Sequence, residues 1–152
     1  MVKVLTNSAK ETVALGKKFS KILKEKDVVL FEGALGGGKT TFIKGILRGF
    51  NLKAKALSPS FTLVRRYHKR RLYIYHIDLY RLDNADVFSF GIEDYLYAPG
   101  VIVLVEWGEK FEKHLSRYIK AEFSFLGESA RKISFSYKGY SNKIFSSIRK
   151  TQ

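Results

Sequence analysis

The glycine-rich stretch from residue 33 to residue 41 contains the residue types best suited to chemistry in this sequence. "GALGGGKT", Gly33 to Thr40, satisfies the pattern G-x-x-x-x-G-K-[ST]. Glycines let successive backbone N–H groups converge on phosphate oxygens, at the start of a helix whose dipole favours anions. The residues predicted to bind a nucleotide's phosphates are Gly33, Leu35, Gly36, Gly37, Gly38, Lys39, Thr40 and Thr41.

The two side chains at the end of this pattern have different predicted roles. Lys39 would bridge the β- and γ-phosphates and assist catalysis, and the Thr40 hydroxyl would be a ligand of Mg²⁺. The guanine-reading pattern N-K-x-D is missing, because "NKIF" from Asn142 has no acidic residue at its end. We therefore expect ATP rather than GTP, with Mg²⁺ as the metal.

Two acidic residues follow apolar runs that are typical of buried strands. Asp78 follows "YIYHI", and Glu106 follows "VIVLV". In open α/β sheets, the carboxyl ends of the strands face the crevice where ligands bind. We predict that Asp78 and Glu106 act on the metal and on the attacking water. The spacing does not decide which of them contacts the metal directly.

The tryptophan and the histidines give weaker signals. Trp107, next to Glu106, could stack on a base, although a single Trp is more often part of a core. His68, His76 and His114 do not have the spacing of metal ligands, and His76 is expected to be a structural residue of an aromatic strand.

A basic segment precedes Asp78. Its cations alternate with tyrosines and are Arg65, Arg66, Lys69, Arg70 and Arg71, with Tyr67 and Tyr73 among them. Such a segment could follow a nucleic-acid backbone. Hairpin turns are also commonly charged and solvated, and that second interpretation is favoured here.

The elements that must position these residues alternate between strand and helix. Ser8 and Glu11 form a capping-box pattern at the start of an amphipathic helix. The predicted helices are 8–26, 39–50 and 85–96, the last ending in a turn, and single strands are predicted at 2–6, 27–33 and 101–106. Residues 60–82 are predicted to form two strands joined by the basic turn "HKRR" at 68–71. Residues 118–139 are predicted to form two alternating strands joined by a turn, in which Ile119, Ala121, Phe123 and Phe125 point one way and match Ile133, Phe135 and Tyr137. We predict one α/β P-loop NTPase domain, residues 1–152. Its mixed, mostly parallel central sheet is flanked by helices, with β-hairpin additions.

Composition limits the class of protein. The 152 residues contain no cysteine and have a net charge of +14; residues 110–152 alone contain 10 basic and 3 acidic side chains. A field of this sign attracts polyanions, although charge alone does not specify a partner. Without an apolar run of membrane-spanning length or a secretory leader, we expect a cytoplasmic protein with no membrane partner.

Several ordered motifs resemble those of the TsaE family, the small ATPases of bacterial tRNA threonylcarbamoyladenosine synthesis. They are "GALGGGKTTF" in the loop, "SPSFTLV" at 58–64, "YHIDLYRL" at 75–82, "GIEDYL" at 91–96, "VEWGEK" at 105–110 and "GESAR" at 127–131. Ala34 stands where the family usually has Asp, and Ser60 where it usually has Thr.

The resemblance implies roles for individual residues. Glu106 would complete the metal site with Thr40, and Asp78 would lie near the γ-phosphate. Ser58, Ser60 and Thr62 would belong to a switch-like loop that senses the nucleotide. Trp107 would lie beside the site, and Arg131 would be a further nucleotide contact.

The resemblance also implies partners. TsaD-like and TsaB-like proteins would carry out the transfer to the adenosine beside the anticodon of tRNA. This chain would be a weak Mg²⁺-dependent ATPase, stimulated by these partners, whose hydrolysis of ATP drives their turnover. Direct contact with tRNA stays open. The alternatives are a small-molecule P-loop kinase, which needs an acceptor pocket, and a basic RNA-binding module.

Overall fold

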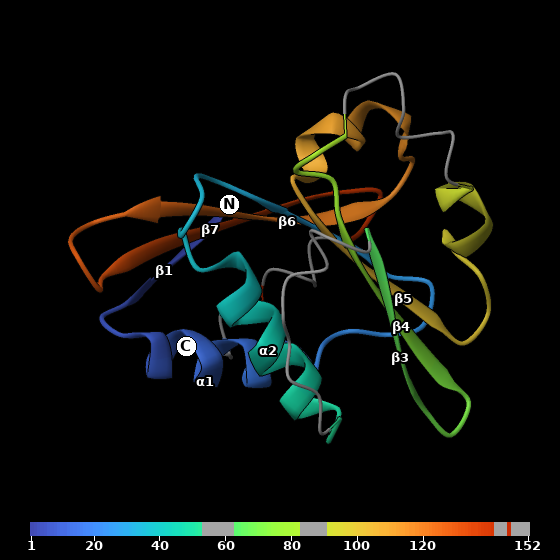
Figure 1. Ribbon diagram of the computed structural model, residues 1–152, viewed down its shortest axis with the longest axis horizontal. Coiled ribbons are helices and arrows are strands. Elements are labelled where there is room, and N and C mark those ends of the chain that lie inside the picture. The colour runs from blue at the N-terminus through green and yellow to red at the C-terminus, as the bar shows by residue number, and fades with distance from the viewer. Residues whose placement is uncertain (53–62, 83–90, 142–145, 147–152) are drawn as a thin grey trace.

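The computed structural model describes residues 1–52, 63–82, 91–141 and 146 (Figure 1). The predicted switch residues Ser58, Ser60 and Thr62 lie outside the described residues, as do residues 85–90, the first half of the predicted helix 85–96.

Within the described residues, seven strands form one sheet in the order β1-β7-β6-β2-β5-β4-β3. The strands are β1 (Val2–Thr6), β2 (Val28–Glu32), β3 (Val64–Lys69), β4 (Leu72–Asp78), β5 (Val101–Glu106), β6 (Tyr118–Phe125) and β7 (Arg131–Lys138). The four central strands, β6, β2, β5 and β4, run parallel, and the outer pairs are antiparallel. The predicted α/β class with a mixed sheet is confirmed.

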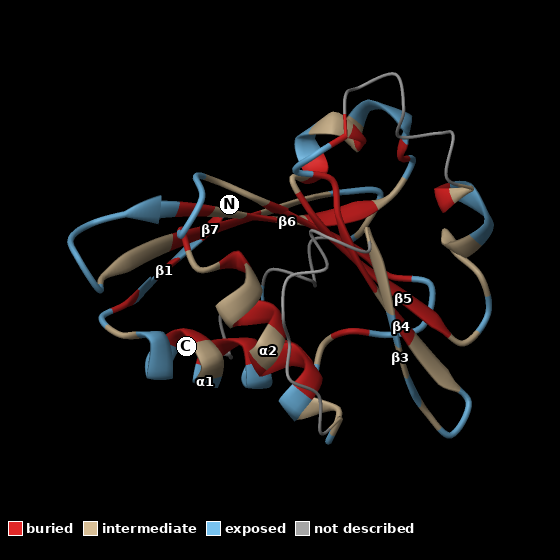
Figure 2. Ribbon diagram, in the orientation of Figure 1, coloured by how far each residue is buried: buried red, intermediate tan, exposed pale blue. Residues whose placement is uncertain are grey.

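The apolar runs of β2 and β5 explain their central position. Every residue of β5 is buried, and so are the first four residues of β2. A strand without alternation must be covered on both faces, which only the middle of a layered sheet provides. Figure 2 shows these strands as a buried layer between the covering elements.

Two α-helices, α1 (Ala9–Phe19) and α2 (Lys39–Gly49), cover one face of the sheet (Figure 1). They cross at glycines. A β-carbon added to Gly45 would lie 2.2 Å from the carbonyl oxygen of Val13, and one added to Gly16 would lie 2.2 Å from that of Phe42. The backbones therefore touch, and α2 is held firmly against its neighbour at the turn that follows the glycine loop.

The start and the end of α1 both differ from the prediction. Ser8 caps the helix by accepting the N–H of Glu11 at 3.1 Å, but the Glu11 carboxylate bonds the N–H of Asn7 instead of Ser8. The helix ends at Phe19 rather than residue 26. The N–H groups of residues 21–23 bond carbonyls three residues back, so the chain tightens into turns.

The opposite face of the sheet is covered by three short 3₁₀ helices, η1 (Ile92–Tyr95), η2 (Gly108–Lys110) and η3 (Glu112–His114). The β6–β7 hairpin pairs as predicted, with Phe123 opposite Ile133 and Ala121 opposite Phe135. Phe125, predicted to point the same way as Phe123, is 48% exposed as the last residue of β6. No helix in the described parts of the chain is long and apolar enough to cross a membrane.

Candidate functional site

The carboxyl ends of the parallel strands β2, β4 and β5 meet at one edge of the sheet. Asp78, the last residue of β4, pairs in register with Glu106, the last residue of β5, and Glu106 is also opposite Phe31 of β2. Parallel pairing of adjacent strands therefore brings together two acids that are distant in the sequence. It places them beside the glycine loop that leaves β2.

The loop has the backbone that its sequence pattern requires. Gly33 has a φ of +123°, and an added β-carbon there would lie 2.4 Å from the carbonyl oxygen of Phe123. Gly38, the N-cap of α2, has a φ of +103° and no side chain with which to cap the helix. The first N–H groups of an α-helix have no acceptors within the helix. At α2 they are consequently available to an anion.

A cavity of about 220 Å³ lies between the loop and the acids. Its lining comprises Leu35, Gly36, Gly37, Gly38, Lys39, Thr40, Thr41, Asp78, Tyr80, Glu106 and Trp107. With the exception of Gly33 and Arg131, all predicted phosphate-binding and catalytic residues within the described part of the chain line it. Gly33 lies beneath the loop as the last residue before it turns.

Lys39 is buried within the loop. Its Nζ donates to the carbonyl oxygens of Gly33, at 2.5 Å, and Ala34, at 3.0 Å, and lies 4.2 Å from the centre of the Trp107 ring. Burial lowers the pKa of Lys39, and the nearby Glu106 carboxylate opposes that effect. The ammonium group is thus held inside the cavity by weak neutral acceptors that an anion could replace.

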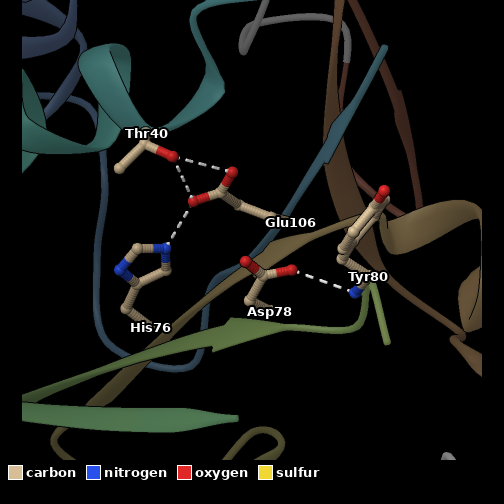
Figure 3. A network of polar contacts seen from close by, with 5 residues as sticks. All are labelled: Thr40, His76, Asp78, Tyr80 and Glu106. Carbon is tan, nitrogen blue, oxygen red and sulfur yellow. Dashed lines mark hydrogen bonds and ion pairs between the residues drawn. The ribbon is translucent and has the colours of Figure 1, made fainter. Parts of the chain in front are cut away.

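The Glu106 carboxylate joins three elements (Figure 3). It is 3% exposed and accepts the Thr40 hydroxyl, at 2.8 Å to one oxygen and 3.0 Å to the other. Nε2 of His76, on β4, lies 2.8 Å from Oε1 of the same carboxylate. The first turn of α2 is thereby attached to the ends of β4 and β5.

The place of His76 in this site was not predicted from the sequence. The imidazole is fully buried, and its Nδ1 has no hydrogen-bond partner among the described residues. One signal was available: His76 precedes Asp78 by two positions on one strand, so both side chains point to the same face of the sheet. The histidines lack the spacing of metal ligands, which argued against His76 as a ligand. That spacing gave no information on whether His76 contacts a metal ligand such as Glu106.

Asp78 and Trp107 also line the cavity, and the Trp107 ring lies against the Lys39 ammonium. Asp78 is 2% exposed, and its Oδ1 accepts the N–H of Tyr80 at 2.9 Å (Figure 3). Trp107 has a φ of +61°, which is rare for a bulky residue, and its ring centre lies 5.0 Å from that of Tyr80. Backbone strain of this kind occurs most often at functional sites.

Arg131 lies on the far side of the loop. Its guanidinium donates to the carbonyls of Gly127, Glu128 and Ala130, and one nitrogen is 3.5 Å from the carbonyl oxygen of Gly36. A second cavity, of about 200 Å³, lies beside it and is lined by Gly36, Gly38, Thr41 and Arg131, among others. Arg131 is therefore next to the loop, although most of its hydrogen bonds go to its own turn, and its contact with a nucleotide stays a prediction.

Comparison with known proteins gives a consistent result. A family model described as "Threonylcarbamoyl adenosine biosynthesis protein TsaE" matches residues 6–133. The chain is 36% identical over 135 residues to the tRNA threonylcarbamoyladenosine biosynthesis protein TsaE of Treponema pallidum, covering 88% of this chain and 98% of that protein. It is 34% identical over 135 residues to TsaE of Bacillus subtilis, covering 88% of this chain and 84% of the relative. The crystal structure of Bacillus subtilis YdiB superimposes with a TM-score of 0.79 at 29% identity, covering 99% of this chain and 93% of that one.

Proposed function

The chain belongs to the TsaE family of tRNA threonylcarbamoyladenosine biosynthesis, and from that premise we propose that it is the subunit that binds and hydrolyses ATP. The observation that supports this most is the hydrogen bond between Thr40 and Glu106 at the mouth of the glycine loop. It places a hydroxyl and a carboxylate, side by side, at the point where a helix N-terminus opens into a cavity.

The oxygen atoms of Thr40 and Glu106 are suitable ligands for a magnesium ion. Mg²⁺ prefers hard oxygen ligands and is usually held by one or two protein oxygens together with phosphate oxygens and water. Thr40 and Glu106 would hold it, and when bound it would neutralise charge on the phosphates. Their mutual hydrogen bond holds the Thr40 hydroxyl, in the first turn of α2, next to the Glu106 carboxylate, at the end of β5.

The remaining side chains have roles that follow from their positions. The loop N–H groups bind the phosphates, and Lys39 exchanges its two carbonyl acceptors for phosphate oxygens. The exchange is favourable because phosphate oxygens carry negative charge, which attracts a buried ammonium group more strongly than a neutral carbonyl does. Asp78, on the cavity wall, orients the attacking water and accepts its proton.

Substitution of Lys39 tests this assignment. In Lys39→Ala we expect MgATP binding, measured by calorimetry, to fall below detection. Arg48→Ala is the matched control, because it removes one charge from the exposed face of the same helix. Equal affinity of Lys39→Ala and the unmodified chain would contradict the assignment. Transfer of labelled phosphate to a metabolite, rather than its release, would favour a small-molecule kinase.

The partners follow from the family. We propose that the chain binds TsaD-like and TsaB-like proteins in the cytoplasm, and that hydrolysis of ATP resets that assembly between rounds of tRNA modification. A pull-down with the cell's own transferase pair, with and without ATP, tests this. Capture that does not depend on nucleotide, and modification that proceeds through many turnovers without this chain, would contradict the role in turnover.

A further inference from the structure

The β3–β4 hairpin carries a second surface that the ATP site does not use. Residues 64–77 contain five arginine and lysine side chains and no acidic residue. Figure 1 shows the hairpin projecting beyond the helical layer. We propose that its outer face binds RNA through the phosphates and the unpaired bases of a loop.

Alternation along the two strands divides the basic segment between two faces. Tyr67 packs against the core beneath the α-helices, and Nζ of Lys69 donates to the carbonyl of Phe50 on that same side. Arg66 and His68 point to the other face and are exposed. The binding face is therefore only part of the predicted cluster.

Aromatic rings lie among the cations on this outer face. The ring of His68 stacks on Tyr73, its partner across the strands, with centres 5.2 Å apart and planes at 25°. The guanidinium of Arg66 lies 5.9 Å from the Tyr73 ring, and Tyr75 contacts Tyr95 at 4.3 Å. Flat rings next to guanidinium groups form a platform on which unpaired bases can stack. An acidic protein partner would be bound by the cations alone and would not require the rings.

The surface continues along the edge of the sheet where the parallel strands begin. The carbonyl of Arg71 lies against Gly100, and the N–H of Lys26 bonds the carbonyl of Val101. Arg117 donates to the carbonyl of Lys26. Its guanidinium also lies over the rings of Tyr97, at 5.8 Å, and Tyr140, at 5.1 Å. A row of cations and rings thus extends beyond the hairpin.

We define the basic edge by its exposed or half-buried members: Lys26, Arg66, His68, Arg70, Arg71, Tyr73, Tyr97 and Arg117. Acidic side chains are few beside it. Glu25, whose carboxylate accepts the N–H of Gly100, lies on the edge itself, and Glu93 and Asp94 of η1 flank Tyr95. The salt bridges within the described residues, His76–Glu106, Lys120–Glu32 and Lys120–Glu112, involve none of the cations of the basic edge.

The basic edge is separate from the ATP site. The hairpin turn precedes Leu72, whereas the site lies at Asp78, the last residue of the same strand. At a rise of about 3.3 Å per residue, the six steps from Leu72 to Asp78 span about 20 Å, and the three steps from Tyr75, the register partner of Arg66, span about 10 Å. An RNA loop on the basic edge would leave the cavity open, so the proposal does not depend on ATP binding.

The test is the binding of a fluorescent RNA stem-loop over a range of salt concentrations. In the double variant Arg66→Gln with Arg71→Gln, we expect affinity to fall, and the slope of log K against log salt to decrease by about 1.4, or about 0.7 for each lost phosphate contact. The double variant Lys10→Gln with Lys17→Gln, on the exposed side of α1, removes the same charge elsewhere and should leave the slope within error.

A second variant separates base stacking from charge. Tyr73→Leu keeps an apolar side chain over the core but removes the ring, and we expect about tenfold weaker binding of the stem-loop with no change for heparin. Unchanged slopes in the arginine variant would overturn the proposal. Equal affinity for RNA, heparin and an acidic polypeptide, unaffected by Tyr73→Leu, would also overturn it and indicate a protein-docking surface. Because Lys39→Ala should bind the stem-loop normally, failure here is distinguishable from failure of the ATPase proposal.

Discussion

Replacement of His76 by phenylalanine tests whether the buried imidazole holds Glu106 in place. The carboxylate is 3% exposed and has donors from only two side chains among the described residues, Thr40 and His76. Phenylalanine fills about the same space but cannot donate. Loss of a hydrogen bond to a charged group costs about 1.5–3 kcal/mol, and more where the remaining charge stays buried.

That free energy can be converted into a melting temperature. For a chain of this length, 1 kcal/mol shifts the midpoint by about 2–4 °C, so His76→Phe should melt about 3–12 °C below the unmodified protein. The freed carboxylate should also weaken the magnesium dependence of ATP binding, since one of its oxygens can turn away. Circular dichroism with heating measures the first effect, and calorimetric titration of MgATP against ATP alone measures the second.

Two controls distinguish this reasoning from a general effect of histidine loss. His68→Phe changes an exposed histidine on the neighbouring strand and should melt within about 1 °C of the unmodified protein. His76→Gln keeps a donor and should recover part of the lost stability. A His76→Phe variant that melted with the unmodified protein and bound MgATP with unchanged affinity would show that the imidazole does not hold Glu106 in place.

Three further predictions concern the site and the core. Thr40→Val removes the hydroxyl bonded to Glu106 and should weaken MgATP binding at least tenfold while ATP alone binds as before; equal losses for both would remove the magnesium role. Gly45→Ala places a methyl group 2.2 Å from the carbonyl oxygen of Val13 and should lower the urea-unfolding free energy by about 2 kcal/mol or more, whereas an unchanged value would mean that the helices separate without strain. Burial raises the pKa of Glu32 to about 7 from 4.5, so the folded state binds the extra proton and stability falls as pH rises through that interval. Glu32→Gln should therefore be more stable than the unmodified chain by about 1 kcal/mol at pH 8 and equal at pH 4.5; a gain that is the same at both pH values would contradict this titration.

Local sequence determined the glycine loop, the acidic residues at two strand ends and the class of fold. The pattern from Gly33 to Thr40 specifies a turn that only glycines can make, and it lies between an apolar run and an amphipathic helix. Asp78 and Glu106 each end an apolar run, which places each of them at the carboxyl end of a strand. These features could be read from the sequence because each depends on residues close together in the chain.

The tertiary structure alone decided which groups meet across elements. Lys39 lies against Trp107, and His76 against Glu106, only because β5 is placed between β2 and β4 in the sheet. The strand order depends on how much apolar surface is buried on the two faces of the sheet. Residues from all parts of the chain contribute to that burial. Residue type and spacing therefore define what a side chain can do, while packing across the sheet determines which partner it has.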